Sequence, residues 1–301
     1  MQEIRNPIAG VAYSSDEKAA YYLANGSWMN SSVGDALRAT AARYPNRPAF
    51  ISDEQTITFQ ELDEKTDLIG AALLDMGLVP GDRVLFQLGT NIETVLVAHA
   101  CHKAGIIPVC TILQYREVEI GALGLKSGAK AHFVQADFSQ FDLVEFAQQM
   151  REQNPAIEHI VVVRGDAPEG TSSLQTLLES MSLSKARERL KAVELGPRDV
   201  LTFQLSGGST GLPKIIPRFH GEYLGHSAAF SQCYKINSDS RIIWSLPIIH
   251  NAGQLYALMP PIVLGLTSVL MPKVDIERML QLIEEHKVTH GLSIGPIAPQ
   301  L

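Results

Sequence analysis

An α/β fold built from stacked βαβ subdomains is the architecture that this sequence predicts. Short apolar segments alternate with stretches of about 10–15 residues at helical spacing, which is typical of parallel sheets covered by helices. The alternation occurs twice, before residue 164 and after residue 199, without any repetition of the sequence itself. At 301 residues, of which 46% are hydrophobic, the chain is long enough for two such units.

The first unit follows residues 1–30, which predict an irregular leader. Apolar residues at helical spacing indicate helices over Val33–Tyr44 and Glu61–Met76, and Gly77 stands where a helix is expected to end. The elements expected next, in order, are a strand Val84–Leu88, a helix from Asn91 to Lys103, a strand Ile106–Cys110, a helix Glu117–Lys126, a strand Ala131–Val134, a helix Phe141–Glu152 and a strand His159–Val163. Asn91 is a favourable helix N-cap.

The second unit follows residues 164–199, whose glycine, proline, serine and charge predict a connection between subdomains. The elements expected after it are a strand Val200–Leu205, a glycine-rich loop, an extended segment Ile215–Pro217, a helix Gly221–Tyr234, a strand Arg241–Leu246, a helix after Asn251, a strand Thr267–Met271, a helix Asp275–Lys287 and a strand Val288–Ile294. This divides the chain into a leader (1–30), a first α/β subdomain (31–196) and a second one (197–301).

Composition excludes several classes of function. The net charge of −7, with no run of basic residues, argues against a nucleic-acid partner or an anionic membrane surface. The uncharged stretch 242–272 is broken by prolines and polar residues, so we expect no membrane span. The three cysteines are far apart, which predicts no metal site, and Cys101 and Cys110 lie in apolar context as inert core thiols. With no apolar signal segment at the amino terminus, a cytoplasmic location is expected.

The most informative segment is Ser206–Lys214, which reads Ser-Gly-Gly-Ser-Thr-Gly-Leu-Pro-Lys. Glycines allow backbone N–H groups to turn toward a ligand, and successive N–H groups form a concavity that binds anions. Hydroxyl groups and one lysine add donors. The segment therefore predicts a loop that wraps a polyphosphate. Its candidate binding residues are Ser206, Gly207, Gly208, Ser209, Thr210, Gly211 and Lys214.

Other interpretations of this segment fit less well. A P-loop requires Gly-Lys-Ser/Thr, whereas Lys214 follows Pro213 and precedes Ile215. Gly207–Gly211 matches the nucleophile elbow of serine hydrolases, but that motif needs a helix from Ser209, and the following prolines and β-branched residues favour a strand. A flexible linker is also unfavourable between two apolar runs. A serine hydrolase using Ser209 and a non-catalytic nucleotide-binding module stay as the alternatives.

The loop, extended through Ile-Ile-Pro-Arg, resembles the phosphate loop of the adenylate-forming (AMP-binding) superfamily. Ile57–Leu62 followed by Gly81–Val84 looks like the amino-terminal pattern of these enzymes, and Leu246–Asn251 looks like their acid-pocket motif. The combination of Ile-Pro-Arg with His-Asn is most similar to the aryl-acid branch, typified by 2,3-dihydroxybenzoate–AMP ligases. The resemblance extends from about Tyr22 to the end of the chain.

This resemblance implies the fold of the amino-terminal domain of such an enzyme and an ATP-dependent ligase activity. An aromatic carboxylic acid would be converted to an acyl-adenylate with release of pyrophosphate, and then transferred to the thiol of CoA or a carrier protein, as in siderophore or secondary-metabolite biosynthesis. The implied cofactors are ATP and Mg²⁺, with the metal ligand expected outside these residues. The implied catalytic residues are Lys214 and His250, and the implied acid-pocket residues are His250, Asn251, Gln254 and Tyr256.

The sequence departs from the dihydroxybenzoate enzymes at two places. Ala252–Tyr256 follows Asn251 where they have an aromatic residue and small serines, and Gln114-Tyr115-Arg116 has no histidine before the arginine. Salicylate, anthranilate or a heteroaryl acid therefore stays open as substrate. The adenine motif, ribose aspartate and lid lysine of the superfamily have no counterpart here, so we expect an amino-terminal portion that is inactive alone. His220 and His226 are expected on a surface or helix face.

Overall fold

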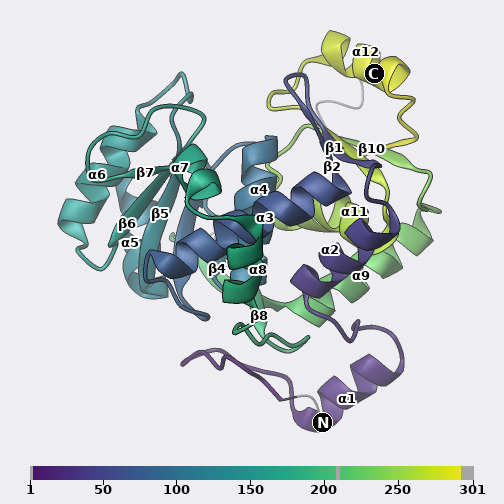
Figure 1. Cartoon of the computed structure of the whole chain (residues 1–301), viewed down its shortest axis with the longest axis horizontal. Coiled ribbons are helices and arrows are strands. Elements are labelled where there is room, and N and C mark those ends of the chain that lie inside the picture. Colours follow the sequence, from purple (N-terminus) through teal and green to yellow (C-terminus); the bar gives the residue numbers. More distant parts are fainter. Residues whose placement is uncertain (1–2, 208–210, 293–301) are drawn as a thin grey trace.

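The computed structural model describes residues 3–207 and 211–292 and is organised by two sheets (Figure 1). The seven-stranded sheet has the order β7 (Ser172–Ser173), β6 (His159–Val163), β5 (Ala129–Gln135), β3 (Arg83–Gln87), β4 (Ile107–Val109), β8 (Val200–Ser206) and β9 (Lys214–Phe219). The five-stranded sheet has the order β12 (His290–Gly291), β10 (Arg241–Trp244), β11 (Thr267–Leu270), β1 (Pro48–Ile51) and β2 (Thr56–Thr58). The α/β class is confirmed.

Helices cover both sheets and fill the space between them. The helices are α1 (Asp16–Ala24), α2 (Val33–Arg43), α3 (Phe59–Asp75), α4 (Ile92–Ala104), α5 (Glu117–Ser127), α6 (Leu143–Gln153), α7 (Leu174–Glu179), α8 (Leu183–Leu190), α9 (His220–Cys233), α10 (Asn251–Gly253), a π-helix (Gln254–Leu258), α11 (Met259–Leu264) and α12 (Ile276–Glu285). The largest core joins both sheets to the central helices, among them α3 and α4. α5 and α6 pack on the outer face of the seven-stranded sheet, and α12 on that of the five-stranded sheet. Figure 1 shows these flanking layers on either side of α3 and α4.

Local signals in the sequence account for several helix ends. The Asn91 side chain accepts a hydrogen bond from the Thr94 N–H at 2.8 Å, as the expected N-cap of α4. Thr58 and Glu61 form a reciprocal capping box at the start of α3. α4 ends at Gly105, whose φ of +70° is the left-handed conformation that glycine adopts readily.

Some sequence-based expectations were wrong. The expected leader contains α1, and the expected connection at 164–199 contains β7, α7 and α8. The sheets are mixed rather than purely parallel, because β8 and β9 pair antiparallel, as do β1 and β2. His220 lies on helix α9, which was one of the two expected positions, but it is buried rather than on the surface; its Nδ1 accepts a hydrogen bond from the Val33 N–H at 3.1 Å. His226 is exposed on α9.

The sheets exchange strands across the expected subdomain boundary at residues 196 and 197. β8 and β9 follow this boundary in the chain but belong to the sheet of β3 to β7. β1 precedes it, yet β1 pairs in parallel with β11, where Phe50 lies opposite Ser268. The first strand of the chain therefore pairs with a strand near its end, and each sheet contains strands from both sides of the expected boundary.

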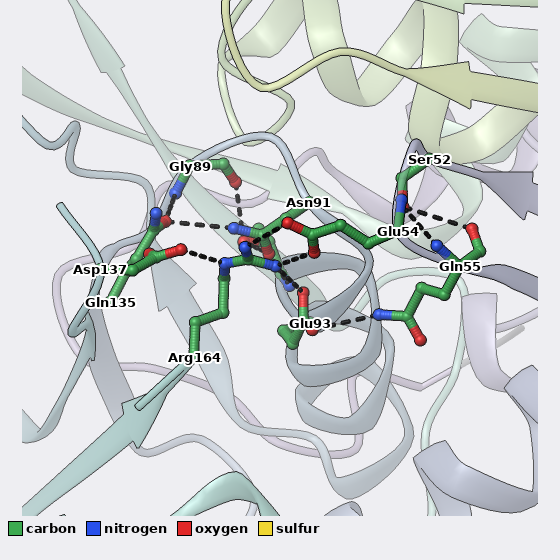
Figure 2. A network of polar contacts seen from close by, with 10 residues as sticks. Ser52, Glu54, Gln55, Gly89, Asn91, Glu93, Gln135, Asp137 and Arg164 are labelled. Carbon is green, nitrogen blue, oxygen red and sulfur yellow. Dashed lines mark hydrogen bonds and ion pairs between the residues drawn. The ribbon is translucent and has the colours of Figure 1, made fainter. Parts of the chain in front are cut away.

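An arginine joins the two sheets near their strand ends (Figure 2). Arg164, just after β6, forms a bidentate ion pair with Glu54 in the β1–β2 turn, at 2.6 and 2.7 Å. Its guanidinium also contacts Asp137 at 2.7 Å and Glu93 at 3.3 Å. Arg164, Glu54 and Asp137 line one side of a cavity of about 570 Å³ between the sheets, at the carboxyl ends of β3, β5, β1 and β11.

Candidate active site

The glycine-rich segment connects two strands that pair with each other. Ser206, at the end of β8, lies opposite Lys214 at the start of β9. Gly207 and Gly211 are exposed, and Gly211 has a φ of +127°, which side-chain-bearing residues rarely adopt. The expected phosphate-binding residues Gly208, Ser209 and Thr210 lie outside the described residues.

The element after the loop is a strand, as the prolines and β-branched residues predict. β9 pairs with β8 along its length, from Lys214 to Phe219. A nucleophile elbow places its serine between a strand and a helix. The turn between β8 and β9 joins two strands instead, and the serine-hydrolase alternative loses its structural basis.

The expected acid-pocket motif, Leu246–Asn251, follows β10 and is anchored to the seven-stranded sheet. The Thr90 hydroxyl, between β3 and α4, donates to the Leu246 carbonyl at 2.6 Å and accepts from the Ile248 N–H at 3.1 Å. Gln204, on β8, donates from Nε2 to the Ile249 carbonyl at 3.0 Å. The strand that leads into the glycine-rich loop therefore contacts the motif directly, and the two segments lie next to each other.

A buried polar cluster lies behind the motif. Gln254 donates from Nε2 to the Ile249 carbonyl and to Cys110 Sγ, both at 3.2 Å. Cys110 Sγ also lies 3.0 Å from the Thr202 hydroxyl. Gln254 is 2% exposed, and its Oε1 has no hydrogen-bond partner among the described residues. Gln254 was expected to contact the acid, and a buried carbonyl oxygen without a donor is compatible with a ligand that supplies one.

Asn251 is half-buried and contacts a residue from another helix. The Tyr223 hydroxyl, on α9, donates to Asn251 Oδ1 at 2.7 Å. The Arg218 guanidinium lies over the Tyr223 ring, 4.9 Å from its centroid, and pairs with Glu222 at 2.6 Å. Arg218 belongs to the Ile-Pro-Arg sequence after the loop, so β9 brings the loop's continuation to the acid motif.

The other two expected acid-pocket residues lie in different surroundings. His250 is exposed, and its Nδ1 accepts a hydrogen bond from the Ala252 N–H at 3.3 Å. Tyr256 stacks on Phe230 of α9, with ring centroids 3.8 Å apart, and meets Trp244 edge-on. The structure thus brings Asn251 and Gln254 close to β8, whereas the ring of Tyr256 contacts the aromatic rings of Phe230 and Trp244.

Burial keeps the Tyr223 phenol and the Cys110 thiol uncharged. Desolvation raises the pKa of the Tyr223 phenol. It also raises the pKa of the Cys110 thiol to about 12, although the hydrogen bonds that Cys110 forms with Thr202 and Gln254 work against this rise. Cys110 is therefore a protonated core thiol rather than a nucleophile. Within residues 3–207 and 211–292, no cluster of His, Cys, Asp and Glu is placed to hold a metal ion.

Sequence reasoning missed three contributors to this site. Gln204 could have been noticed as a polar residue inside an apolar strand. The sequence around Thr90 and Tyr223 does not indicate their roles, because each forms its hydrogen bond with a residue more than 25 positions away, Leu246 and Asn251 respectively. Among the residues that the structure describes, no helix is long and apolar enough to span a bilayer.

The comparisons with known proteins agree with this arrangement. A family of proteins described as AMP-binding enzymes matches residues 37–301. The chain belongs to the AMP-binding enzyme family. A 2,3-dihydroxybenzoate-AMP ligase of Bacillus subtilis is 32% identical over 288 residues, which are 94% of this chain and 51% of the ligase. The salicyl-AMP ligase / salicyl-S-ArCP synthetase of Mycobacterium tuberculosis is 30% identical over 91% of this chain and 48% of that protein.

Solved structures confirm the fold of this AMP-binding enzyme. Apo MbtA of Mycobacterium smegmatis superposes with a TM-score of 0.85 at 28% sequence identity, covering 94% of this chain and 52% of MbtA. The chain spans about half the length of the curated relatives it matches. The relatives and the strand after the loop leave the serine-hydrolase alternative without support. The roles of the individual site residues stay predictions.

Proposed function

We propose that this AMP-binding enzyme activates an aromatic carboxylic acid with ATP, forming an acyl-adenylate and pyrophosphate, before the acyl group passes to a thiol. The observation that carries the proposal is the hydrogen bond from Gln204 to the Ile249 carbonyl at 3.0 Å. It joins the strand that enters the glycine-rich loop to the motif that contains His250 and Asn251. A reaction between a polyphosphate and a carboxylate needs both binding sites side by side.

The loop residues are suited to phosphate oxygens. Ser206 and Lys214 face each other across the hairpin, and the exposed Lys214 ammonium can move to a developing negative charge. The open space beside Gly207 and Gly211 allows an anion to approach their backbone. ATP with Mg²⁺ is the cofactor that we propose, and the magnesium ligand is expected outside the described residues. The ion would supply charge neutralisation to the phosphates.

Asn251 is the residue that we propose to face the aromatic acid. It is half-buried next to the strand that bears the loop, and its amide can form a hydrogen bond with a substituent beside the carboxylate. The names of the relatives, which specify 2,3-dihydroxybenzoate and salicylate, support an ortho-substituted aryl acid. CoA and a carrier protein are both suitable thiol acceptors, and the three free cysteines suit a cytoplasmic setting.

ATP–pyrophosphate exchange tests the proposal. The full-length gene product that contains this chain is assayed with a panel of benzoates, heteroaryl acids and, for comparison, fatty acids and amino acids. We expect exchange with at least one aryl acid and none with the aliphatic acids. Exchange confined to the aliphatic acids would contradict the aromatic substrate class.

Lys214→Ala in the same protein should reduce kcat/KM for exchange by about 10- to 100-fold, because it removes one charge-assisted contact of about 1.5–3 kcal/mol. Lys185→Ala is the matched control, since Lys185 is an exposed lysine on α8, away from the loop. Equal activity of the two variants would remove Lys214 from the proposed phosphate contacts.

A further inference from the structure

The Asn251 carboxamide is held in one orientation by a residue from another element. The Tyr223 hydroxyl donates to Asn251 Oδ1 at 2.7 Å. Burial raises the pKa of this phenol, which therefore keeps its proton near neutral pH. The protonated hydroxyl has a single hydrogen, and that hydrogen is used on the Asn251 oxygen.

The Tyr223 ring itself has little freedom. Tyr223 is fully buried, with the Arg218 guanidinium over its face. The hydroxyl therefore cannot follow Asn251 if the amide rotates, and a flipped amide would leave a buried hydroxyl without an acceptor.

The orientation determines what Asn251 offers to a ligand. A carboxamide has one acceptor atom, the oxygen, and two N–H donors on the nitrogen. The oxygen is engaged by Tyr223, whereas Nδ2 has no partner within residues 3–207 and 211–292. The free part of the half-buried Asn251 side chain is thus a hydrogen-bond donor.

Aromatic acids with different ortho substituents respond differently to such a donor. In 2-hydroxybenzoate the O–H donates to the neighbouring carboxylate, and the lone pairs of its oxygen are left to accept. In 2-aminobenzoate one N–H donates to the carboxylate and the other points outward. The nitrogen lone pair is delocalised into the ring and accepts poorly. A donor on the protein therefore meets an acceptor in the first acid and a second donor in the other.

We propose that Tyr223 is a specificity-determining positioning residue, which fixes Asn251 as a donor and makes the site select aromatic acids with an ortho oxygen acceptor over ortho-amino acids. This inference rests on the proposed function, because it takes Asn251 to face the acid. Tyr223 acts through Asn251 and needs no contact with the substrate.

The test is ATP–pyrophosphate exchange by the full-length gene product with 2-hydroxybenzoate, 2-aminobenzoate and benzoate. We expect wild-type protein to prefer 2-hydroxybenzoate over 2-aminobenzoate by at least about tenfold in kcat/KM. In Tyr223→Phe the Asn251 amide is free to rotate, and the ratio of kcat/KM for 2-hydroxybenzoate to kcat/KM for 2-aminobenzoate should decrease about five- to tenfold. KM for ATP should stay unchanged. A general loosening of the fold would instead change KM for ATP as well as the preference between the acids. Tyr234→Phe, at an exposed tyrosine directly after α9, is the matched control.

A second variant separates positioning from packing. In an Asn251→Ala background, Tyr223→Phe should not change the ratio between the two acids further, because the group that Tyr223 orients is gone. A ratio that still changes there would overturn the proposed route through Asn251. A wild-type preference for 2-aminobenzoate, or an unchanged ratio in Tyr223→Phe, would overturn the inference and leave the proposed function intact. Absence of exchange with every aromatic acid, together with exchange on another acid class, would overturn both.

Discussion

At the scale of single residues, the site depends on side chains whose partners come from elsewhere in the chain. Asn251 is the last residue of the expected acid-pocket motif, and its side-chain oxygen accepts a hydrogen bond from Tyr223 of α9. Gln254 is buried with a carbonyl oxygen that lacks a donor among the described residues. Gly211 has a φ of +127° in the hairpin connection. Substitutions of Asn251 and Gly211 can therefore test what these features contribute to the site.

Asn251→Ala should affect the choice of acid more than the use of ATP. Removal of the amide leaves an ortho-hydroxyl group without its donor, so kcat/KM for 2-hydroxybenzoate should decrease by a factor that corresponds to about 1–3 kcal/mol. Plain benzoate has no such group and should change little, as should KM for ATP. Exchange kinetics with both acids measure this. Unchanged acid selectivity together with a large loss of ATP affinity would move Asn251 out of the acid pocket.

Gly211→Ala should impair exchange without abolishing folding. At a φ of +127° a Cβ adds strain of about 1–3 kcal/mol, and the hairpin connection must change its shape to relieve it. Gly26→Ala is the matched control, because Gly26 also has a positive φ and open space around it but lies in the segment before α2. Both variants should lower the thermal midpoint, and only Gly211→Ala should raise KM for ATP. Equal exchange kinetics of the two variants would argue against a role for the conformation of the connection.

At the scale of elements, contacts between loops hold the two sheets together. The Thr90 hydroxyl holds Leu246 and Ile248, and Arg164 holds the β1–β2 turn through Glu54. Arg164 has a φ of +59°, the left-handed conformation that favours glycine. Its backbone is therefore strained where its guanidinium gathers three carboxylates (Figure 2).

Arg164→Ala should destabilise the protein by about 1–3 kcal/mol, since Glu54, Glu93 and Asp137 lose their shared cation while the backbone strain persists. Arg164→Gly loses the same ion pairs but relieves the strain, so it should be more stable than the alanine variant by about 1 kcal/mol. Urea unfolding of the three proteins measures both differences. The loss should be smaller at high salt, because the partners are partly exposed. If the alanine variant matches wild type, the network does not stabilise the fold.

At the scale of the whole molecule, the core contains four buried histidines. Burial lowers the pKa of His99, His132 and His220 to about 3, and lowers that of His102 well below its usual value. Lys103 adds to the shift at His99, and the two neighbouring histidines add to the shift at His102. These side chains remain neutral in the folded protein at pH values where an unfolded chain binds protons.

The protein should therefore be unstable in mild acid. Below pH 6.5 the unfolded state takes up protons at these histidines while the folded state does not, so the free energy of unfolding decreases as pH falls from about 6.5 toward 3. Each histidine contributes about 1.4 kcal/mol per pH unit in this window. Urea midpoints measured between pH 8 and pH 5 should decrease steeply, whereas stability above pH 7 should be insensitive to these groups.

His132→Leu isolates one of these contributions. Neither ring nitrogen of His132 has a partner among the described residues, so a leucine of similar volume should retain the packing. The number of protons taken up on unfolding in acid should decrease by about one, and the dependence of the free energy of unfolding on pH should become correspondingly less steep. His159→Gln on the adjacent strand β6 is the control, because that side chain is only half-buried. A pH slope that is unaffected by His132→Leu would assign the acid sensitivity to other groups.

The sequence alone determined the features that short-range physics controls. Apolar spacing placed α2, α3, α4 and β6 within a few residues, and Asn91 caps its helix because an amide side chain can reach the N–H groups of the first turn. The prolines and β-branched residues after the glycine-rich loop favoured a strand, and the observed strand β9 distinguishes this connection from a nucleophile elbow, which a helix would follow. Glycines, hydroxyls and a lysine in one loop were enough to suggest phosphate chemistry.

Only the tertiary structure decided which segments meet. Periodicity indicates which face of an element is buried, but it contains no information on the partner that covers it. The pairing of β1 with β11, the burial of His220 against α2 and the contact between Tyr223 and Asn251 all join segments far apart in the chain. Their formation depends on the closure of long loops and on packing of the whole core, and that closure is what places the glycine-rich segment next to the motif Leu246–Asn251.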